Sequence, residues 1–279
     1  NSFCTLLARR KMPGKKSTPQ YEHVLRDPRF KKEVYEPEAD SFLLLDALDI
    51  DRAAIRARAT DGNVCRVLEL GCGSGIAVTH AAMIATMLPS SDDDDDDGDS
   101  EAADGGGATK RRAACMAIDV NPVALEATRR TFDASVDEGL RRSGAATLEL
   151  LRGDLMTPLS LRAKFDVLIF NPPYVPTSVD ELNDAVRDAR ADKSWICAAW
   201  AGGPAGRLVV DRVLPVLHLL LEPATGAAYV IALEENLMDD MVRMVEHFSQ
   251  GALTGRVAIS RWTGEKLNVL KFFWREAAA

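Results

Sequence analysis

Cysteine is scarce in this chain of 279 residues, and histidine is scarcer still. The five cysteines are odd in number and none shows a Cys-x-x-Cys spacing, which excludes a disulfide framework or a structural zinc centre as the basis of the fold. The four histidines are scattered singly, so no metal site is expected. No apolar run is long enough to span a bilayer. We therefore expect a protein of a reducing compartment, the cytoplasm, with the nucleus as the alternative.

The chain also lacks a basic excess. Its formal net charge is −8, but nine acids fall between residues 92 and 104, and without them the charge would be +1. The remainder is near neutral and gives no argument for strong binding to a nucleic-acid backbone. Three glycines and a basic triplet follow the acidic run, and this low complexity predicts a disordered insert over residues 89–112.

The first 20 residues carry five basic side chains and no acid. Such a start is typical of a transit peptide. Alternatively, translation begins at Met12 and the preceding residues are an upstream artefact, which is the interpretation we favour. In either case we predict a disordered basic segment over residues 1–30. Residues 31–279 are then expected to form a single domain, long enough to bury a substantial core.

One stretch of the chain combines a buried strand with two prolines. Residues 165–170 are apolar except for Asp166, which predicts a strand buried on both faces, and Asn171-Pro172-Pro173-Tyr174 follows. Proline lacks an N–H, so the chain must leave the sheet at this point. In open α/β sheets, ligands bind at the carboxyl ends of the strands.

This tetrapeptide suits the recognition of a planar NH2 group. The Asn171 side chain and the Pro172 carbonyl each offer an acceptor, and Tyr174 can cover a π face. An amide or exocyclic amine held in this way directs its nitrogen at an electrophile. A rigid turn without chemistry explains the tetrapeptide alone about equally well.

A glycine-rich turn lies earlier in the chain. An apolar strand over residues 66–70 is followed by Gly71, Gly73 and Gly75, and then by a predicted helix over residues 76–88. Glycine allows a tight turn and a close approach to a ligand. The Gly-x-Gly-x-Gly spacing is shorter than that of dinucleotide-binding folds, so it favours a nucleoside without phosphates, such as S-adenosylmethionine, over a nicotinamide cofactor. A purely structural turn is the alternative.

Acids follow the next two predicted strands. Asp119 ends the strand over residues 113–119, where it can accept hydrogen bonds from a ribose diol, and Asn121 and Pro122 are expected to begin the next helix. Asp154 lies in the turn after a third strand that begins at Thr147. A simple turn residue is the alternative for each acid.

The remaining segments complete an alternation of strands and helices, which indicates an α/β protein. The polar, acid-rich residues 177–194 suggest a mobile flap over the site. The other predicted elements are a helix over 35–48, an apolar helix over 208–221, a strand over 226–233, an amphipathic helix over 239–250, and a closing strand pair over 256–259 and 267–273.

Together these motifs resemble a known family. Asn-Pro-Pro-Tyr is the signature of amino-methyltransferases that act on glutamine side chains or on adenine N6. Residues 35–44 and the Trp-Ala-Gly-Gly-x-x-Gly-Arg segment at 200–207 are similar to segments of the eukaryotic and archaeal release-factor glutamine N5-methyltransferase catalytic subunits. This HemK-like family is also described as N6-adenine-methyltransferase-like. The resemblance runs from about residue 35 to residue 273, interrupted by the acidic insert.

The resemblance implies a fold and a reaction. The fold is that of a class I methyltransferase, a Rossmann-like, seven-stranded, mostly parallel sheet with strand order 3-2-1-4-5-7-6 and helices on both faces. The reaction is S-adenosylmethionine-dependent N5-methylation of the glutamine of a Gly-Gly-Gln motif in the class 1 translation termination (release) factor. Methylation of adenine N6 in DNA or RNA, methylation of protein lysine, and a non-catalytic binding module remain alternatives.

The resemblance also assigns residues and partners. Asn171, Pro172 and Tyr174 are expected to be catalytic, and with Pro173 they form the substrate-binding set. The cofactor-binding residues implied are Ser41, Glu69, Gly71, Gly73, Gly75, Asp119, Asp154, Leu155 and Asn171. Asp154 is expected to meet the adenine amino group, and Ser41 stands where most of the family carry threonine. The family forms a heterodimer with a small zinc-binding activator subunit, which we expect to add a strand to the exposed third strand. The release factor is the expected substrate, and neither nucleic acid nor a membrane is an expected partner.

Overall fold

The computed structural model describes residues 18–60, 62–87, 111–159, 163–191 and 195–276. The predicted acidic insert therefore lies outside the described residues as far as residue 110. Its last two residues are described. Arg112 begins a strand, and the Arg111 guanidinium donates a hydrogen bond to the Arg56 carbonyl oxygen at 3.0 Å. The strand thus begins one residue earlier than the sequence predicts.

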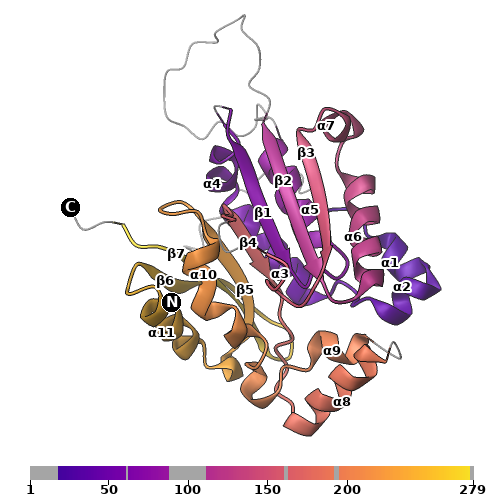
Figure 1. The fold of residues 1–279 in the computed structure, drawn as a ribbon, viewed down its shortest axis with the longest axis vertical. Helices are drawn as coiled ribbons and strands as arrows, with labels where there is room; N and C mark the ends of the chain where they lie inside the picture. Colours follow the sequence, from indigo (N-terminus) through magenta and orange to yellow (C-terminus); the bar gives the residue numbers. More distant parts are fainter. Residues whose placement is uncertain (1–17, 61, 88–110, 160–162, 192–194, 277–279) are drawn as a thin grey trace, which may run out of the picture.

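Seven strands form one sheet in the order β3-β2-β1-β4-β5-β7-β6, which confirms the predicted topology. The strands β1 to β5 run parallel, whereas β7 pairs antiparallel with both β5 and β6. Figure 1 shows the parallel strands β1 to β5 and, beside them, the antiparallel pair of β6 and β7. The strands are β1 Val64–Leu70, β2 Arg112–Asp119, β3 Ala146–Arg152, β4 Val167–Phe170, β5 Ala227–Leu233, β6 Leu253–Trp262 and β7 Lys266–Trp274.

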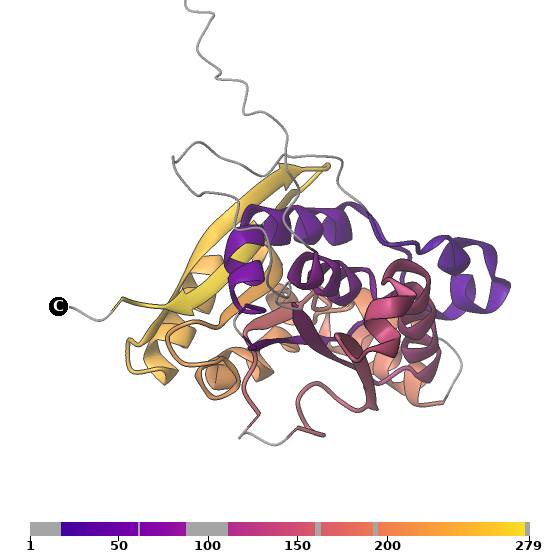
Figure 2. The ribbon, with the colours of Figure 1, turned by 90° about the horizontal axis from the view of Figure 1, so that it is seen from above.

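Helices cover both faces of this sheet. The helices α3 (Ala39–Ile50), α4 (Arg52–Ala57), α5 (Ile76–Thr86) and α6 (Pro122–Ser135) lie on one face, and α10 (Leu217–Leu220) and α11 (Met238–Phe248) lie on the other (Figure 2). The remaining helices are α1 Glu22–Arg26, α2 Pro28–Glu33, α7 Glu138–Arg142, α8 Val179–Arg190 and α9 Ile196–Trp200. None of the helices within the described residues is long and apolar enough to cross a membrane.

The sheet has an apolar core on each face, and the alternation of side chains along the strands explains both cores. Successive side chains of a strand point to opposite faces. In β5, Tyr229 and Ile231 pack with α3 and α5, whereas Ala228 and Val230 pack with α10 and α11. Because β5 carries apolar side chains on both of its faces, it is buried on both, as expected of a central parallel strand.

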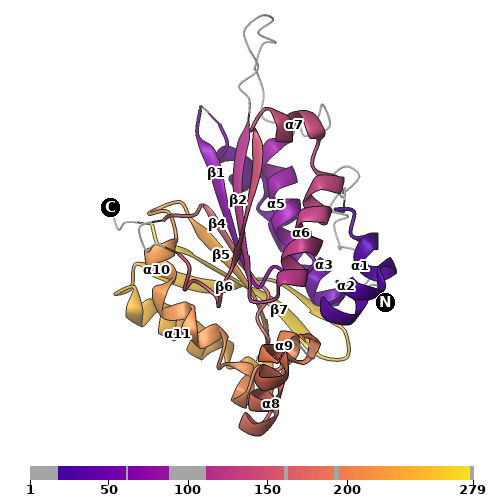
Figure 3. The ribbon, with the colours of Figure 1, turned by 45° about the vertical axis from the view of Figure 1, so that its right-hand side comes forward.

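Residues 18–30 correct the predicted disorder of the amino-terminal segment. They form α1 and the first half of α2, which pack against α6 (Figure 3). Val24 and Phe30 are buried there against Ala124 and Ala127, and the guanidinium of Arg130 lies 4.7 Å from the Phe30 ring centroid. A few large apolar side chains therefore order a segment whose composition is mostly polar, and the prediction is wrong for these residues.

The segment predicted as one apolar helix over residues 208–221 is also different. It is broken into the short 3-10 turns Val210–Arg212 and Leu214–Val216, followed by α10. Pro215 lies in this segment, and proline cannot donate the backbone hydrogen bond that a continuous helix needs. The acid-rich segment after β4 is helical, because Ser178 and Glu181 form a reciprocal capping box at the start of α8.

Candidate active site

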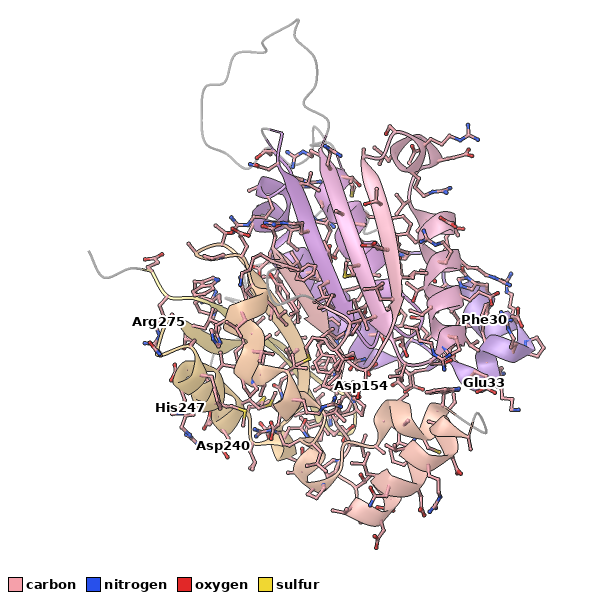
Figure 4. All side chains as sticks on the ribbon, in the orientation of Figure 1. Phe30, Glu33, Asp154, Asp240, His247 and Arg275 are labelled. Carbon is pink, nitrogen blue, oxygen red and sulfur yellow. The ribbon has the colours of Figure 1, made fainter. Side chains whose placement is uncertain are left out.

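The register of the parallel strands brings four strand ends to one edge of the sheet. Leu70 at the end of β1 pairs with Ile118 of β2 and with Phe170 of β4. Asp119 at the end of β2 pairs with Arg152 of β3. The residues that follow these strands, which carry the predicted site, therefore lie at the same edge. Figure 4 shows Asp154 there, on the side of the sheet edge where α8 and α9 lie.

The glycines after β1 have different roles. All three have positive φ, at +64° for Gly71, +51° for Gly73 and +74° for Gly75. A Cβ atom on Gly75 would lie 2.6 Å from Thr128 Cα, so this glycine allows α5 to pack on α6. A Cβ on Gly73 would meet nothing within 4 Å. The loop therefore borders open space at Gly73, as a ligand-binding loop requires.

Asp119 holds this loop in place. Its Oδ2 accepts the Gly73 N–H at 3.0 Å, and its Oδ1 accepts the Asn121 N–H at 2.9 Å. Burial raises the pKa of the Asp119 carboxyl above its usual value, although these backbone hydrogen bonds oppose the shift. Each carboxylate oxygen retains a lone pair, so Asp119 can still accept hydrogen bonds from a diol. Asn121 caps α6 as predicted, with Pro122 at the first helical position.

Glu69 is a buried acid that solvent does not screen. Its side chain is 4% exposed, and its Oε2 accepts the Val78 N–H near the start of α5 at 3.0 Å. Burial raises the pKa of the Glu69 carboxyl to about 8, with Asp119 adding a smaller contribution of the same sign. A buried carboxylate of this kind is stabilised by any cationic group that binds beside it.

The pKa of Glu69 makes the stability of the ligand-free chain depend on pH. A folded-state pKa of about 8 lies above the ordinary value of 4.5, so the stabilisation is complete below 4.5 and is lost as the pH rises towards 8. We expect the melting temperature to fall less between pH 5 and pH 8.5 in Glu69→Gln than in the wild type, by roughly 8 °C. Calorimetry at the two pH values measures this difference, and an equal fall in both proteins would contradict it.

Asp154 is engaged by an arginine that no sequence motif indicates. Arg212 donates from Nη1 to Asp154 Oδ1 at 3.0 Å and from Nη2 to Asp154 Oδ2 at 2.8 Å, and both side chains are about half exposed. Leu155 has a positive φ of +52° and is 8% exposed. Such a conformation is costly for leucine and is typical of a binding site. The adenine contact of Asp154 stays a prediction, and the carboxylate that would make it already accepts hydrogen bonds from Arg212.

A second missed residue is Asp40, which lies in α3 and contacts the Asn-Pro-Pro-Tyr loop through its carboxylate. Its Oδ2 accepts from Asn171 Nδ2 at 2.9 Å and from the Tyr174 hydroxyl at 3.2 Å. The Ser41 hydroxyl donates to the other carboxylate oxygen, Oδ1, at 3.3 Å. Asn171 Oδ1 is buried and has no hydrogen-bond partner among the described residues. Burial and the Asp40 charge raise the pKa of the Tyr174 hydroxyl, which therefore stays protonated. Asp40 is part of the segment over residues 35–44 that carries the family resemblance, but the resemblance gave it no role.

The segment over residues 200–207 supports this loop from behind. The Val175 N–H donates to the Trp200 carbonyl at 3.1 Å, and the Gly202 N–H donates to the Val175 carbonyl at 2.9 Å. Asn236, after β5, donates from Nδ2 to the Tyr174 carbonyl at 2.8 Å. A Cβ on Gly202 would lie 2.5 Å from the Pro173 carbonyl oxygen. The two segments can approach so closely only because that side chain is absent.

The predicted site residues thus fall into two connected groups. One comprises the β1 loop, Glu69 and Asp119; the other comprises Ser41, Asn171 and Tyr174, which the unpredicted Asp40 joins through hydrogen bonds. A Cβ on Gly71 would lie 3.9 Å from the Phe170 ring, so the two groups are neighbours. The roles of Pro172 and Pro173 toward a substrate stay predictions.

Comparison with known proteins identifies the family. No family profile matches the chain. The chain is 33% identical to human (Homo sapiens) methyltransferase HEMK2 over 259 residues, covering 92% of this chain and 96% of that protein. It is 27% identical to the eRF1 methyltransferase catalytic subunit mtq2 of Schizosaccharomyces pombe, over 87% and 90% of the two chains. Among solved structures, the E. cuniculi Mtq2–Trm112 complex, which methylates the eRF1 termination factor, matches with a TM-score of 0.52 at 21% identity, over 87% of this chain and 99% of that one. The chain belongs to the HEMK2 methyltransferase family.

Proposed function

We propose that the protein transfers a methyl group from S-adenosylmethionine to the side-chain nitrogen of a glutamine in a translation termination factor. The observation that carries the proposal is the buried Oδ1 of Asn171, an acceptor without a partner among the described residues. The names of the protein's relatives support the same function, since mtq2 is named as an eRF1 methyltransferase catalytic subunit. The Gly-Gly-Gln context of the glutamine is implied by the sequence resemblance.

The residues present fit the cofactor. Gly73 borders open space, the buried Glu69 lacks the screening of solvent, and Asp119 retains acceptor capacity. Glu69 suits an ammonium group, Asp119 suits a ribose diol, and the strained backbone at Leu155 beside Asp154 suits a base edge. Ser41, Gly71 and Gly75 complete the proposed set. When bound, the cofactor supplies an electrophilic methyl group on a sulfonium.

The acceptor side of the reaction depends on orientation. A carboxamide nitrogen is a poor nucleophile, so the protein must position and polarise it. Asn171 Oδ1 and the Pro172 carbonyl would accept the two N–H groups of the amide, and Tyr174 would cover its π face. Pro173 keeps this turn stiff. Orientation of this kind, together with fixed dipoles, can supply most of the rate enhancement.

A partner subunit is part of the proposal. The β3 strand is an edge of the sheet, and Leu150 and Leu151 within it are half-buried. An apolar edge strand is a template for strand addition. We propose that a small zinc-binding activator subunit binds there, as the sequence resemblance implies and as the E. cuniculi complex of Mtq2 with Trm112 supports. The cytoplasm, where termination factors act, is the proposed compartment.

A transfer assay tests the function and the partner together. Labelled S-adenosylmethionine is supplied to the protein, with and without a co-expressed activator subunit. The acceptors are the termination factor, its Gly-Gly-Gln Gln→Ala variant, adenine-containing DNA and RNA, and a lysine-rich histone. We expect label only on the intact factor. Label on nucleic acid or on lysine would replace the proposed substrate, and full activity of a monomeric protein without the subunit would contradict the partner.

A further inference from the structure

We propose that Asp40 is the positioning residue of the acceptor site. Its carboxylate fixes which end of the Asn171 amide faces the substrate, and thereby selects groups that present N–H donors. This inference rests on the proposed function, because it concerns the same acceptor site. Asp40 acts through Asn171 and Tyr174 and is not itself assigned contact with the reacting atoms.

Asp40 is held by hydrogen-bond donors from three parts of the chain. It lies in the first turn of α3 and is 3% exposed. Its Oδ1 accepts the Ser41 N–H at 2.6 Å. Its Oδ2 accepts from Asn171 Nδ2 and from the hydroxyls of Tyr174 and Tyr35, at 2.9, 3.2 and 3.3 Å. Hydrogen bonds from these donors stabilise a buried carboxylate.

The chemistry of these atoms determines the orientation of the amide. A carboxylate can only accept hydrogen bonds, so the atom of Asn171 that faces Asp40 must be the donor, Nδ2. The acceptor Oδ1 then points away from Asp40, where it is buried and finds no partner among the described residues. A buried acceptor without a partner is energetically unfavourable. An N–H group of the substrate would remove that cost.

The crowding of donors around Asp40 also suits a positioning role. Two hydroxyls and one amide converge on Oδ2. The pKa values of both Tyr35 and Tyr174 are raised by burial and by the negative charge of Asp40, so both hydroxyls keep their protons and remain donors. The carboxylate therefore serves to orient the donors that converge on it.

Selectivity follows from this orientation. A glutamine amide offers N–H donors to Asn171 Oδ1, whereas a glutamate carboxylate offers only acceptors and is repelled. In Asp40→Asn, the new amide can donate to Asn171 Oδ1, which allows the Asn171 amide to turn and present its NH2 to the substrate. The variant is then expected to disfavour glutamine and to tolerate glutamate at the target position.

The experiment compares wild type, Asp40→Asn and Tyr35→Phe in complex with the activator subunit. Methyl transfer to the termination factor gives kcat and KM, and the factor whose target Gln is changed to Glu serves as a competitor. For Asp40→Asn we expect kcat/KM to fall about 100-fold. We also expect the ratio of the competitor's inhibition constant to the KM of the glutamine factor to fall about 10-fold, because the variant tolerates glutamate better. Tyr35→Phe is the matched control, because it removes one donor to Asp40 and leaves the Asp40–Asn171 contact; its loss should stay within about 5-fold.

Nuclear magnetic resonance of protein labelled with ¹⁵N-asparagine tests the orientation without a methyl acceptor. The Asn171 side-chain signal is identified by its absence in Asn171→Ala. One of its NH2 protons should exchange slowly with water in the wild type, and both should exchange quickly in Asp40→Asn. Fast exchange in the wild type would overturn the inference, as would an unchanged competitor ratio in Asp40→Asn. An inactive wild type with a slowly exchanging Asn171 proton would instead contradict the proposed function.

Discussion

Replacement of Asn171 by alanine is expected to lower kcat for methyl transfer at least 100-fold, which is about the effect of losing one preorganised hydrogen-bonding group at a reacting centre. The substitution removes Oδ1, the acceptor that would hold the substrate NH2, and also removes one donor to Asp40. Affinity for S-adenosylmethionine should change much less, because Glu69, the β1 glycines and Asp119 are untouched. Initial rates and calorimetric titration of the cofactor measure the two effects separately.

Two controls make this result specific. Asn183→Ala replaces an exposed asparagine of α8 and should keep wild-type activity. The melting temperature of Asn171→Ala should fall modestly, because a buried carboxylate loses one hydrogen bond worth roughly 1–3 kcal/mol. Full activity of Asn171→Ala would show that the acceptor site is assigned wrongly. Equal loss of cofactor binding would assign Asn171 to the cofactor instead.

Gly206→Ala is expected to have the second largest effect, although Gly206 has no proposed contact with substrate or cofactor. Its φ is +65°, and a Cβ there would overlap with the Tyr174 carbonyl oxygen and with Asn236 Nδ2. These two atoms form the hydrogen bond by which Asn236 holds the Asn-Pro-Pro-Tyr loop. We call this contact the clamp. Because backbone and a buried amide cannot move aside cheaply, the loop must shift. We expect a loss of activity of about 100-fold, since a displacement near 1 Å can cost that much.

Gly251→Ala is the matched control for this prediction. Gly251 has a φ of +80°, and a Cβ there would meet nothing within 4 Å, so alanine carries the conformational cost without the overlap. That cost is about 1–2 kcal/mol in both variants. The melting temperature should fall further in Gly206→Ala, and only Gly206→Ala should lose activity. Similar activity in the two variants would show that the clamp does not set the loop position.

The sequence was sufficient for the sheet order and for most of the strand-end residues. Each motif follows directly after an apolar strand, and parallel strands bring their carboxyl ends to one edge, so Asp119 and Asn171 could be placed from the sequence alone. The family resemblance supplied the strand order, and the residue pattern predicted the closing strand pair over 256–259 and 267–273. Both were confirmed by the observed sheet.

Other contacts were beyond reach because they join residues far apart in the chain. Asp40 meets Asn171 across 131 positions, Arg212 meets Asp154 across 58, and Asn236 meets the Tyr174 carbonyl across 62. Local patterns carry no information about such pairs. By contrast, α2 had a local signal that was overlooked, since Asp27 accepts the Arg29 N–H and Pro28 stands at the first helical position.

The position of the transferred methyl group tests the central claim most directly. The termination factor is incubated with S-adenosylmethionine and the protein with its activator subunit, and the Gly-Gly-Gln peptide is fragmented in a mass spectrometer. The account predicts one added methyl group on the side-chain nitrogen of the glutamine, and none when Asn171→Ala replaces the wild type. A methyl group on another residue of the factor, or one that persists undiminished with Asn171→Ala, would contradict it.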